Sequence, residues 1–509
     1  MNPAPAPGRA LHATIFTLAL TDFLQAGMTA FAAAPLMGEL GMGPDQFSFV
    51  AVLYASVAIV AISMHRWCVE RLGGRRYVQL CAGALVAGAV VCALADGFDG
   101  FVIGRTLMAL GAGLFTSSRM IIHHRLAGPG RFKGIRSLAS GLAIGIAAAP
   151  WLAAQAVAHE AWRAIYWTPA ALGVAVLALA EAALPSGPLH SDTPPSRARP
   201  WPQLLLLAAS FALLYALQRA STDFFDEPLR VVLGAFAALV ALAAYLHHQR
   251  QHAQPLLRVA GMLRPRYLFG LAMFFVAYLM LGANNSVLPM LLQHTLGFAW
   301  QTVGDVEALG LVVALLTWLL MSRLLPRRPS PRKYMVAGFF SLATFGALLA
   351  RIDGDATLWW HVLPALAFNS IFLLTVLPVT AMQTFREMEL DERLFSNAQQ
   401  LKNMMGQAGI ALGIALATLG QQWRTALHYT TLAEAINPFN PVFAAALNTL
   451  QHALGAAAPG ADAHQMALAR VAQMTAQQAA LLAGIDHFSA IAGLGVLGVA
   501  ITLGQRIFR

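Results

Sequence analysis

Charged side chains are scarce in this chain of 509 residues. They make up 11% of it, against about 25% in soluble domains, whereas hydrophobic residues make up 58%. Because so few charges cannot cover a water-soluble surface, lipid is the expected solvent. Cysteines are also few. Cys68, Cys81 and Cys92 lie in or beside apolar runs, and we expect free thiols without a metal or disulfide role.

The sequence also lacks the motifs of enzymes and ATP-driven pumps. It has no G-x-x-x-x-G-K-[ST] loop, which excludes ATP hydrolysis as its energy source. No Ser-His-Asp, H-E-x-x-H or paired-cysteine arrangement falls in a loop large enough for a catalytic site. We therefore expect neither an enzyme nor a bound cofactor. The net charge of +10 is spread over short loops, which favours a role in membrane topology over nucleic-acid binding.

Long apolar runs fill most of the chain and predict about fourteen spans, each near the roughly twenty residues that a bilayer requires. Six lie at 12–35, 48–64, 78–95, 101–122, 137–158 and 163–185; two at 204–219 and 230–246; and six at 267–292, 304–325, 334–351, 358–383, 397–422 and 482–507. We therefore predict an all-α membrane protein. Its parts are an N-terminal six-helix bundle (1–185), a linker with two extra spans (186–266) and a C-terminal six-helix bundle (267–509).

The distribution of basic residues predicts the orientation of these spans. Most Lys and Arg fall on one side of the topology, and the densest cluster is Arg327, Arg328, Arg332 and Lys333. Because basic loops stay in the cytoplasm, both termini are predicted to lie inside. The region 423–481 has no spanning run and is placed outside. We expect two short amphipathic helices there.

The loop after the second span carries the first family resemblance. It reads RWCVERLGGRRY and contains Glu70, Arg71, Gly73, Arg75 and Arg76. This loop resembles the D-R-x-G-R-R loop of major facilitator transporters, although Arg66 stands where most members have glycine. The resemblance implies an inner-face latch in which Glu70 pairs with Arg71, or with arginines and a helix end across that face.

Further motifs follow in the family's order. FVIGRTLMALGAGL resembles the fourth-helix motif R-x-x-Q-G-x-G, and GIAAAPWLA resembles the fifth-helix antiporter motif G-x-x-x-G-P-x-x-G. The positions concerned in the fifth helix are Gly145, Ala149, Pro150 and Ala153. AWRAIYWTPAALG is similar to a signature of the fourteen-span drug–proton antiporters. The resemblance covers nearly the whole chain and implies a major facilitator fold with two pseudo-symmetric halves. In the family, the fifth-helix surface is taken to seal the halves together.

Charges inside spans are the best candidates for function, because burying one in lipid costs several kcal/mol unless it is paired or hydrated. Asp22 lies near the middle of the first span, and we expect a carboxylate that titrates protons or contacts a cation. The alternative is a structural hydrogen bond between helices. Arg105 is expected to tune Asp22, and Gln25 to line the same cavity.

Other polar residues in spans are weaker candidates. Asn284, Asn285 and Asn369 are expected to face the cavity. Asp305 and Glu307 are candidates for titration from the outer side, with a solvated helix N-terminus as the alternative.

Two cations near the inner ends of spans have simpler interpretations. Lys402 is expected to extend to the membrane interface, and Arg119 to do the same or to help gating. The aromatic stripe AMFFVAYLM (272–280) is expected to pack or face lipid.

These features predict proton-coupled export of small amphipathic or toxic organic compounds across a bacterial inner membrane, with the proton gradient as energy source. A periplasmic adaptor and an outer-membrane channel are candidate partners. Two alternatives stay open: proton-linked uptake or facilitated transport of a specific metabolite, and a membrane sensor or scaffold that does not transport.

Overall fold

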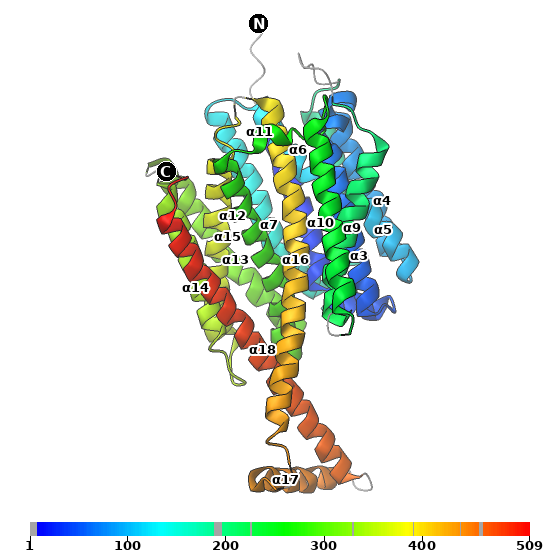
Figure 1. Cartoon of the computed structure of the whole chain (residues 1–509), viewed down its shortest axis with the longest axis vertical. Helices are drawn as coiled ribbons and strands as arrows, with labels where there is room; N and C mark the ends of the chain where they lie inside the picture. Colours follow the sequence, from blue (N-terminus) through cyan, green and yellow to red (C-terminus); the bar gives the residue numbers. More distant parts are fainter. Residues whose placement is uncertain are drawn as a thin grey trace.

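The computed structural model describes residues 8–187, 196–223, 226–327, 330–389, 391–437, 439–457 and 462–508, and these residues contain helices and no strands (Figure 1). Parts of the proline-rich linker, of the cluster around Arg328 and of the connection at 455–463 lie outside the described residues. Of the helices, twelve are long and apolar enough to cross a membrane, or up to thirteen if a bent pair counts as one span. The predicted all-helical membrane fold is confirmed.

The helices are named here by the three consecutive segments of the predicted division, the N-terminal half, the linker and the C-terminal half. The N-terminal half contains α1 (Arg9–Phe31), α2 (Ala33–Glu39), α3 (Pro44–Leu72), α4 (Gly74–Leu94), α5 (Phe98–Leu110), α6 (Gly113–Arg125), α7 (Pro129–Ala158) and α8 (Ala164–Ala183). The linker contains α9 (Pro200–Asp223), α10 (Pro228–Gln251) and α11 (Val259–Met262). The C-terminal half contains α12 (Pro265–Met290), η1 (Leu291–Thr295), α13 (Trp300–Arg327), α14 (Pro331–Leu349), η2 (Leu358–Val362), α15 (Leu363–Thr384), α16 (Glu392–Ala433), α17 (Pro441–Ala457) and α18 (Ala463–Gly504).

The sequence explains where several helices begin and bend. Pro44, Pro228, Pro265 and Pro331 start helices, where the missing N–H of proline has no intrahelical partner to lose. The predicted first span bends by 67° between α1 and α2. The predicted eleventh span is present as α14, but Arg332 and Lys333 in its first turn lower its mean hydropathy and it is not among the twelve. The count of fourteen spans therefore stays a prediction.

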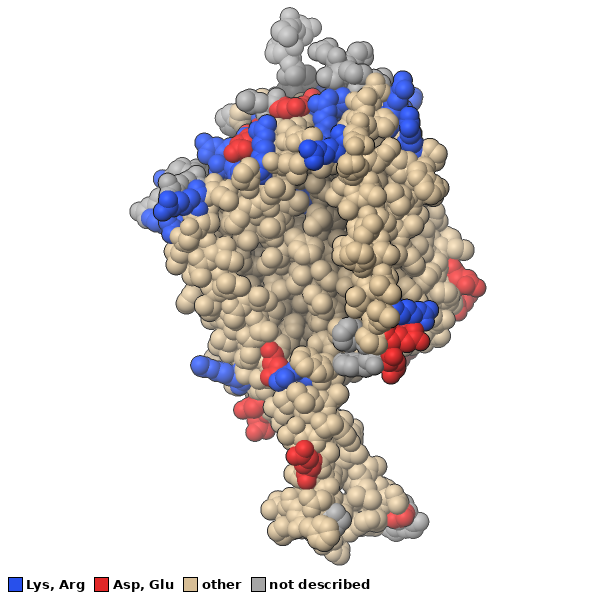
Figure 2. Space-filling view, in the orientation of Figure 1, with Lys and Arg blue, Asp and Glu red and all other residues tan. Residues whose placement is uncertain are grey.

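Lys and Arg gather at the end of the molecule where both termini lie, which we call the basic end (Figures 1 and 2). At the opposite end, α16 and α18 extend beyond the bundle and α17 crosses their tip (Figure 1). The prediction of two short helices in this region is correct for α17 but wrong for the second, which is the first half of the 42-residue α18. The sequence from Ala463 onward is rich in alanine and contains no proline, so the helix continues into the last span.

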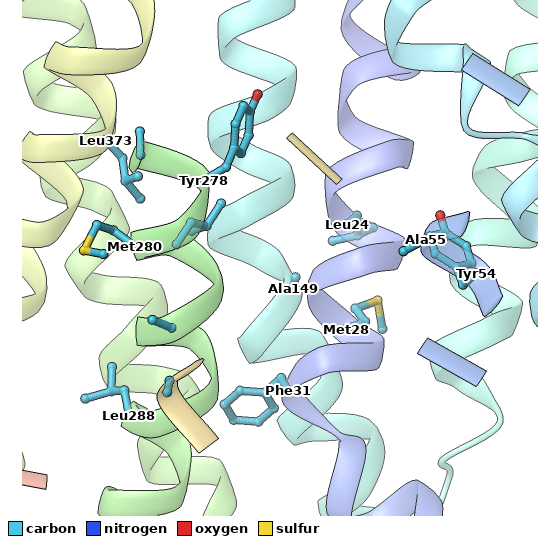
Figure 3. Close-up of a cluster of buried hydrophobic side chains, with 14 of the residues drawn as sticks. Leu24, Met28, Phe31, Tyr54, Ala55, Ala149, Tyr278, Met280, Leu288 and Leu373 are labelled. Atoms are coloured by element: carbon cyan, nitrogen blue, oxygen red, sulfur yellow. The ribbon is translucent and has the colours of Figure 1, made fainter. Parts of the chain in front are cut away.

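Apolar side chains from both halves share one core (Figure 3). Leu24, Met28 and Phe31 of α1 lie on one side, and Tyr278, Met280 and Leu288 of α12 lie on the other. The ring of Phe31 also packs edge-on against Trp300 of α13, with ring centroids 5.5 Å apart. The polar site described next lies within this apolar contact between the halves.

Candidate functional site

Arg105 is held inside the N-terminal half by neutral groups. Its side chain extends from α5, is 7% exposed, and donates hydrogen bonds to Gln25 Oε1 (3.2 Å) and Thr29 Oγ1 (3.5 Å) on α1. The guanidinium lies 4.2 Å from the ring centroid of Tyr54 on α3, and the Tyr54 hydroxyl accepts a hydrogen bond from Gln25 Nε2 at 2.7 Å. The structure thus brings two of the predicted candidates, Gln25 and Arg105, into direct contact, whereas no hydrogen bond or ion pair among the described residues joins Arg105 to Asp22. It adds Tyr54, which the sequence analysis missed because it reads as one more aromatic residue in an apolar run.

Asp22 lies one turn before Gln25 on α1 and is half-buried. Within the described residues it has no direct hydrogen bond or ion pair. It interacts electrostatically with Lys402 and Tyr278 of the C-terminal half and with Tyr54 of its own half. The carboxylate thus has no direct partner among the described residues in this conformation.

Lys402 is buried in the centre of the molecule, so the prediction that it reaches the membrane interface is wrong. It is 3% exposed, and its Nζ donates to the Tyr278 hydroxyl at 3.2 Å. The ammonium also lies 5.3, 5.1 and 5.4 Å from the ring centroids of Phe115, Phe274 and Tyr278. The predicted span began at residue 397, but α16 begins at Glu392. Lys402 is therefore about 15 Å along the helix, too deep for its side chain to reach water.

The position of Lys402 also corrects the interpretation of the stripe AMFFVAYLM. Phe274 and Tyr278 of this stripe surround a charge on α16 and do not serve only as lipid-facing or packing residues.

Arg119 on α6 adds a third cation. Its Nε is buried and has no hydrogen-bond partner among the described residues. Its charge acts on Lys402 and Tyr278 of the other half. The central cluster, as we name it, has seven members: Asp22, Gln25, Tyr54, Arg105, Arg119, Tyr278 and Lys402.

Toward the basic end, hydrogen bonds join α16 to the N-terminal half. Asn403 Nδ2 donates to Thr116 Oγ1 of α6 at 2.7 Å, and Gln400 Nε2 donates to the carbonyl oxygens of Ile62 and Ser63 of α3 at 3.0 and 3.2 Å. We call these contacts the polar seal. Beside it lies a pocket of only about 10 Å³, lined by Arg119, Thr116 and Gln399 among others. In this conformation the halves are closed against each other at the basic end.

Further contacts continue this closure to the surface. Glu392 is the first residue of α16, and its Oε1 lies 3.3 Å from His124 Nε2 and 3.9 Å from Arg66 Nη2. The ring of Phe395, one turn later, stacks on His123 with centroids 4.7 Å apart.

The predicted latch loop is built differently from the expectation. Glu70 pairs with Arg66 Nε at 2.7 Å and not with Arg71. Its other oxygen accepts hydrogen bonds from the backbone N–H (2.9 Å) and the hydroxyl (2.7 Å) of Ser196 in the linker. Arg71 donates to the Ser196 carbonyl at 3.1 Å. Arg66 stands where most family members have glycine, and its positive charge pairs with the carboxylate of Glu70.

The other members of the latch loop make separate contacts. Gly73 ends α3 with a φ of +80°, a conformation that favours glycine. Arg75 pairs with Glu181 of α8, while Arg76 is exposed.

The antiporter-like motif lies where three helices meet. Gly145 of α7 faces the Leu20 carbonyl of α1, and Ala149 faces Gly27, also on α1. Pro150 and Ala154 lie against Gly304 of α13, in the other half, and Ala153 is fully buried. Alanine at position 149 is accommodated because its partner on α1 is glycine.

The structure does not link the remaining candidates to the central cluster by a hydrogen bond or ion pair among the described residues. On α12, Asn284 is buried and Asn285 is exposed. Asn369 on α15, and Asp305 and Glu307 on α13, are half-buried. In the same part of the chain, no group of three or more His, Cys, Asp or Glu side chains could hold a metal ion.

Comparisons with known proteins agree on one family. The family model of the Major Facilitator Superfamily matches residues 15–414. The transporter YhcA of Bacillus subtilis is 23% identical over 429 residues, which cover 82% of this chain and 77% of YhcA. EmrY of Escherichia coli (strain K12), by name a multidrug resistance protein, is 22% identical over 459 residues, or 87% of this chain and 86% of EmrY. MdtD of Klebsiella pneumoniae, also named as a multidrug resistance protein, is 24% identical over 392 residues, or 76% of this chain and 81% of MdtD.

Solved structures agree with this family at the level of the fold. The POT family transporter PepTSo superposes with a TM-score of 0.58 at 13% identity, covering 99% of this chain and 100% of that one. The human organic anion transporter MFSD10 gives a TM-score of 0.57 at 14% identity, covering 98% of this chain and 100% of that one.

Proposed function

Because the chain belongs to the Major Facilitator Superfamily, and is therefore a multi-pass membrane transporter and not an enzyme, we propose that it exports small amphipathic organic compounds in exchange for protons. The observation that carries this proposal is the central cluster. It holds one carboxylate, Asp22 of the N-terminal half, within electrostatic reach of a buried lysine, Lys402 of the C-terminal half. The names of EmrY and MdtD support multidrug-type export.

The proposed coupling uses the charge of Asp22, which a bound proton removes. A charged Asp22 attracts Lys402 and lowers the cost of burying both charges. A proton on Asp22 removes that attraction and changes which conformation is favoured. Opening toward the basic end then requires the polar seal to break, because Asn403 and Gln400 cross from α16 to the other half. Alternating access between the two sides is the family's mode of transport.

The proposed location is a bacterial inner membrane with the basic end in the cytoplasm. The gathering of Lys and Arg at that end supports this orientation (Figure 2). The arm made by the ends of α16 and α18 together with α17 would then extend outward (Figure 1). A periplasmic adaptor leading to an outer-membrane channel would meet the transporter at this arm.

The test uses inside-out membrane vesicles from an efflux-deficient bacterium, energised by respiration. Naphthalene derivatives that carry either an acidic group or an ammonium group are added to the medium around the vesicles. The pH of this medium is then recorded. Export in exchange for protons predicts that an accepted compound releases protons into the medium. Asp22→Asn should abolish this release, because the carboxylate that carries the proton is gone. Asp99→Asn, at an exposed carboxylate in the first turn of α5, is the matched control and should keep full activity.

Substrate-dependent alkalinisation of the medium would instead indicate symport and therefore uptake. Undiminished proton release in the Asp22→Asn variant would remove Asp22 from the coupling mechanism.

A further inference from the structure

We infer that the central cluster selects organic anions: compounds that carry a carboxylate, sulfonate or phosphate group on a flat apolar body. This inference names the substrate class of the transport site and so rests on the proposed function for its location. The charges and aromatic rings around Lys402 and Arg119 support it.

The charges of the central cluster do not balance. Lys402 lies within electrostatic reach of the one carboxylate, Asp22, and of a second cation, Arg119, whereas Arg105 has neutral hydrogen-bond partners. In the described part of the chain, no carboxylate oxygen lies within 4 Å of any of the three cations. Burying unpaired charges is costly, and such groups in membrane proteins mark the paths of substrates and ions. An anionic ligand would supply the missing negative charge.

The present partners of Lys402 are weak substitutes for an anion. Its Nζ has one neutral hydrogen bond, to Tyr278, and the faces of three aromatic rings. Cation–π contacts are weak, and a charged acceptor forms hydrogen bonds roughly twice as strong as neutral ones. Arg119 keeps a buried, unused N–H donor. Both cations thus have capacity left for a ligand.

The same rings define the rest of the ligand. Phe115 comes from α6 and Phe274 and Tyr278 come from α12, so the aromatic walls belong to both halves. Phe23 of α1 extends this wall by packing edge-on against Phe115, with centroids 5.3 Å apart. Flat apolar groups pack favourably against such rings.

An anion at this site would also connect the two halves. Lys402 lies on α16 and Arg119 on α6, so a single acidic group that accepts hydrogen bonds from both would hold the halves together. A cationic compound would meet the like charges of Lys402 and Arg119 there, and this repulsion selects against it.

The experiment measures binding to the purified full chain in lipid nanodiscs by calorimetry. The probes are 1-naphthoate, naphthalene-1-sulfonate and 1-naphthyl phosphate, with 1-naphthylmethylammonium as the cation with the same ring. We expect at least one of the anions to bind and the cation to bind at least tenfold more weakly. Lys402→Gln and Arg119→Gln should each weaken anion binding tenfold or more, while Lys402→Arg should retain most of it.

The chain offers matched controls, because its three lysines are Lys133, Lys333 and Lys402. Lys133→Gln and Lys333→Gln remove the same charge from exposed positions and should leave anion affinity unchanged. Size-exclusion profiles and melting temperatures of all variants establish that they are folded.

Binding of the cation in preference to the anions, binding of none of the probes, or anion affinity that is unchanged in a folded Lys402→Gln protein would each overturn the inference. Anion binding that depends on Lys402, together with no proton release in the vesicle assay, would uphold the anion site and contradict only the proposed proton exchange.

Discussion

Glu70 joins two segments of the chain, α3 and the linker, through one carboxylate. Its side chain is 7% exposed and accepts hydrogen bonds from Arg66 on the same helix and from the backbone and hydroxyl of Ser196 in the linker. Hydrogen bonds to a buried charge are among the strongest in proteins, and removing that charge leaves Arg66 without its close partner. A single residue thus fixes the linker to the latch loop.

Glu70→Gln is therefore expected to destabilise the protein by about 1–3 kcal/mol, because the amide keeps the shape but loses the charge. The measurement is the melting temperature of the purified chain in detergent. Glu39→Gln, at an exposed acid at the end of α2, should stay within about 0.5 kcal/mol of the unaltered protein. Equal melting temperatures for both variants would show that the contacts of Glu70 contribute nothing to stability.

The central cluster shows which residues a sequence can identify. Asp22, Arg105 and Gln25 stood out because polar side chains are rare in apolar spans, and the structure places them on neighbouring helices. Lys402 is also a polar residue in an apolar span, but the predicted span started five residues later than the helix does. Lys402 was therefore wrongly predicted to reach the interface. Tyr54 gave no signal at all, since only its contact with Arg105 distinguishes it from other aromatic residues.

At the scale of helices, glycine pairs decide how closely two elements approach. Gly141 and Gly145 of α7 lie against carbonyl oxygens of α1, and Gly409 and Gly413 of α16 lie against carbonyl oxygens of α12. Each pair is spaced by four residues, so both glycines fall on one helix face. The first and fifth long helices of each half thus pack by the same device, which agrees with two pseudo-symmetric halves.

Alanine at these positions is expected to separate the helices. A Cβ at Gly141 would overlap the Phe16 carbonyl, and one at Gly413 would overlap the Leu279 carbonyl. Because backbone atoms cannot rotate away, Gly141→Ala and Gly413→Ala should each cost about 1–3 kcal/mol of stability. Gly83→Ala in the middle of α4, where no atom lies within 4 Å, should be neutral or stabilising by up to about 1 kcal/mol.

Melting temperatures of the three variants test this expectation. A stabilised Gly141→Ala protein would mean that α1 and α7 do not pack as closely as described.

Sequence patterns predicted which helices exist better than they predicted where those helices begin and end. Apolar runs placed a helix at every predicted span, because burying about twenty apolar residues in lipid dominates all local preferences. The extensions of α16 and α18 beyond the helix bundle could not be predicted from hydropathy, since these segments contain many polar residues and lack a spanning apolar run. The motif resemblance predicted the major facilitator family, and the family match over residues 15–414 confirmed it.

At the scale of the whole molecule, α16 controls how the two halves meet at the basic end. Gln400, Asn403 and Lys402 follow one another on this helix, so the polar seal and the central cluster share one rigid element. A ligand that shifts Lys402 therefore also shifts the residues that close the basic end. Sequence alone could not reveal this link, because the acceptors of Gln400 are backbone carbonyls of α3, more than 300 positions away.

Gln400→Ala removes two hydrogen bonds from the polar seal and is expected to favour opening at the basic end. Losing about 1 kcal/mol of net hydrogen bonding shifts a two-state equilibrium about fivefold. Pulsed EPR distances between labels at Arg76→Cys and Lys333→Cys, exposed positions on opposite halves, would report the change in a background without the native cysteines. We expect a larger population of long distances in the variant.

Since Gln218→Ala removes a hydrogen bond to Ser48 outside the seal, it should leave the distribution unchanged. If the two variants give the same distribution, the polar seal does not hold the halves closed, and other contacts, such as those of Glu392 and Phe395 with the N-terminal half, close the basic end.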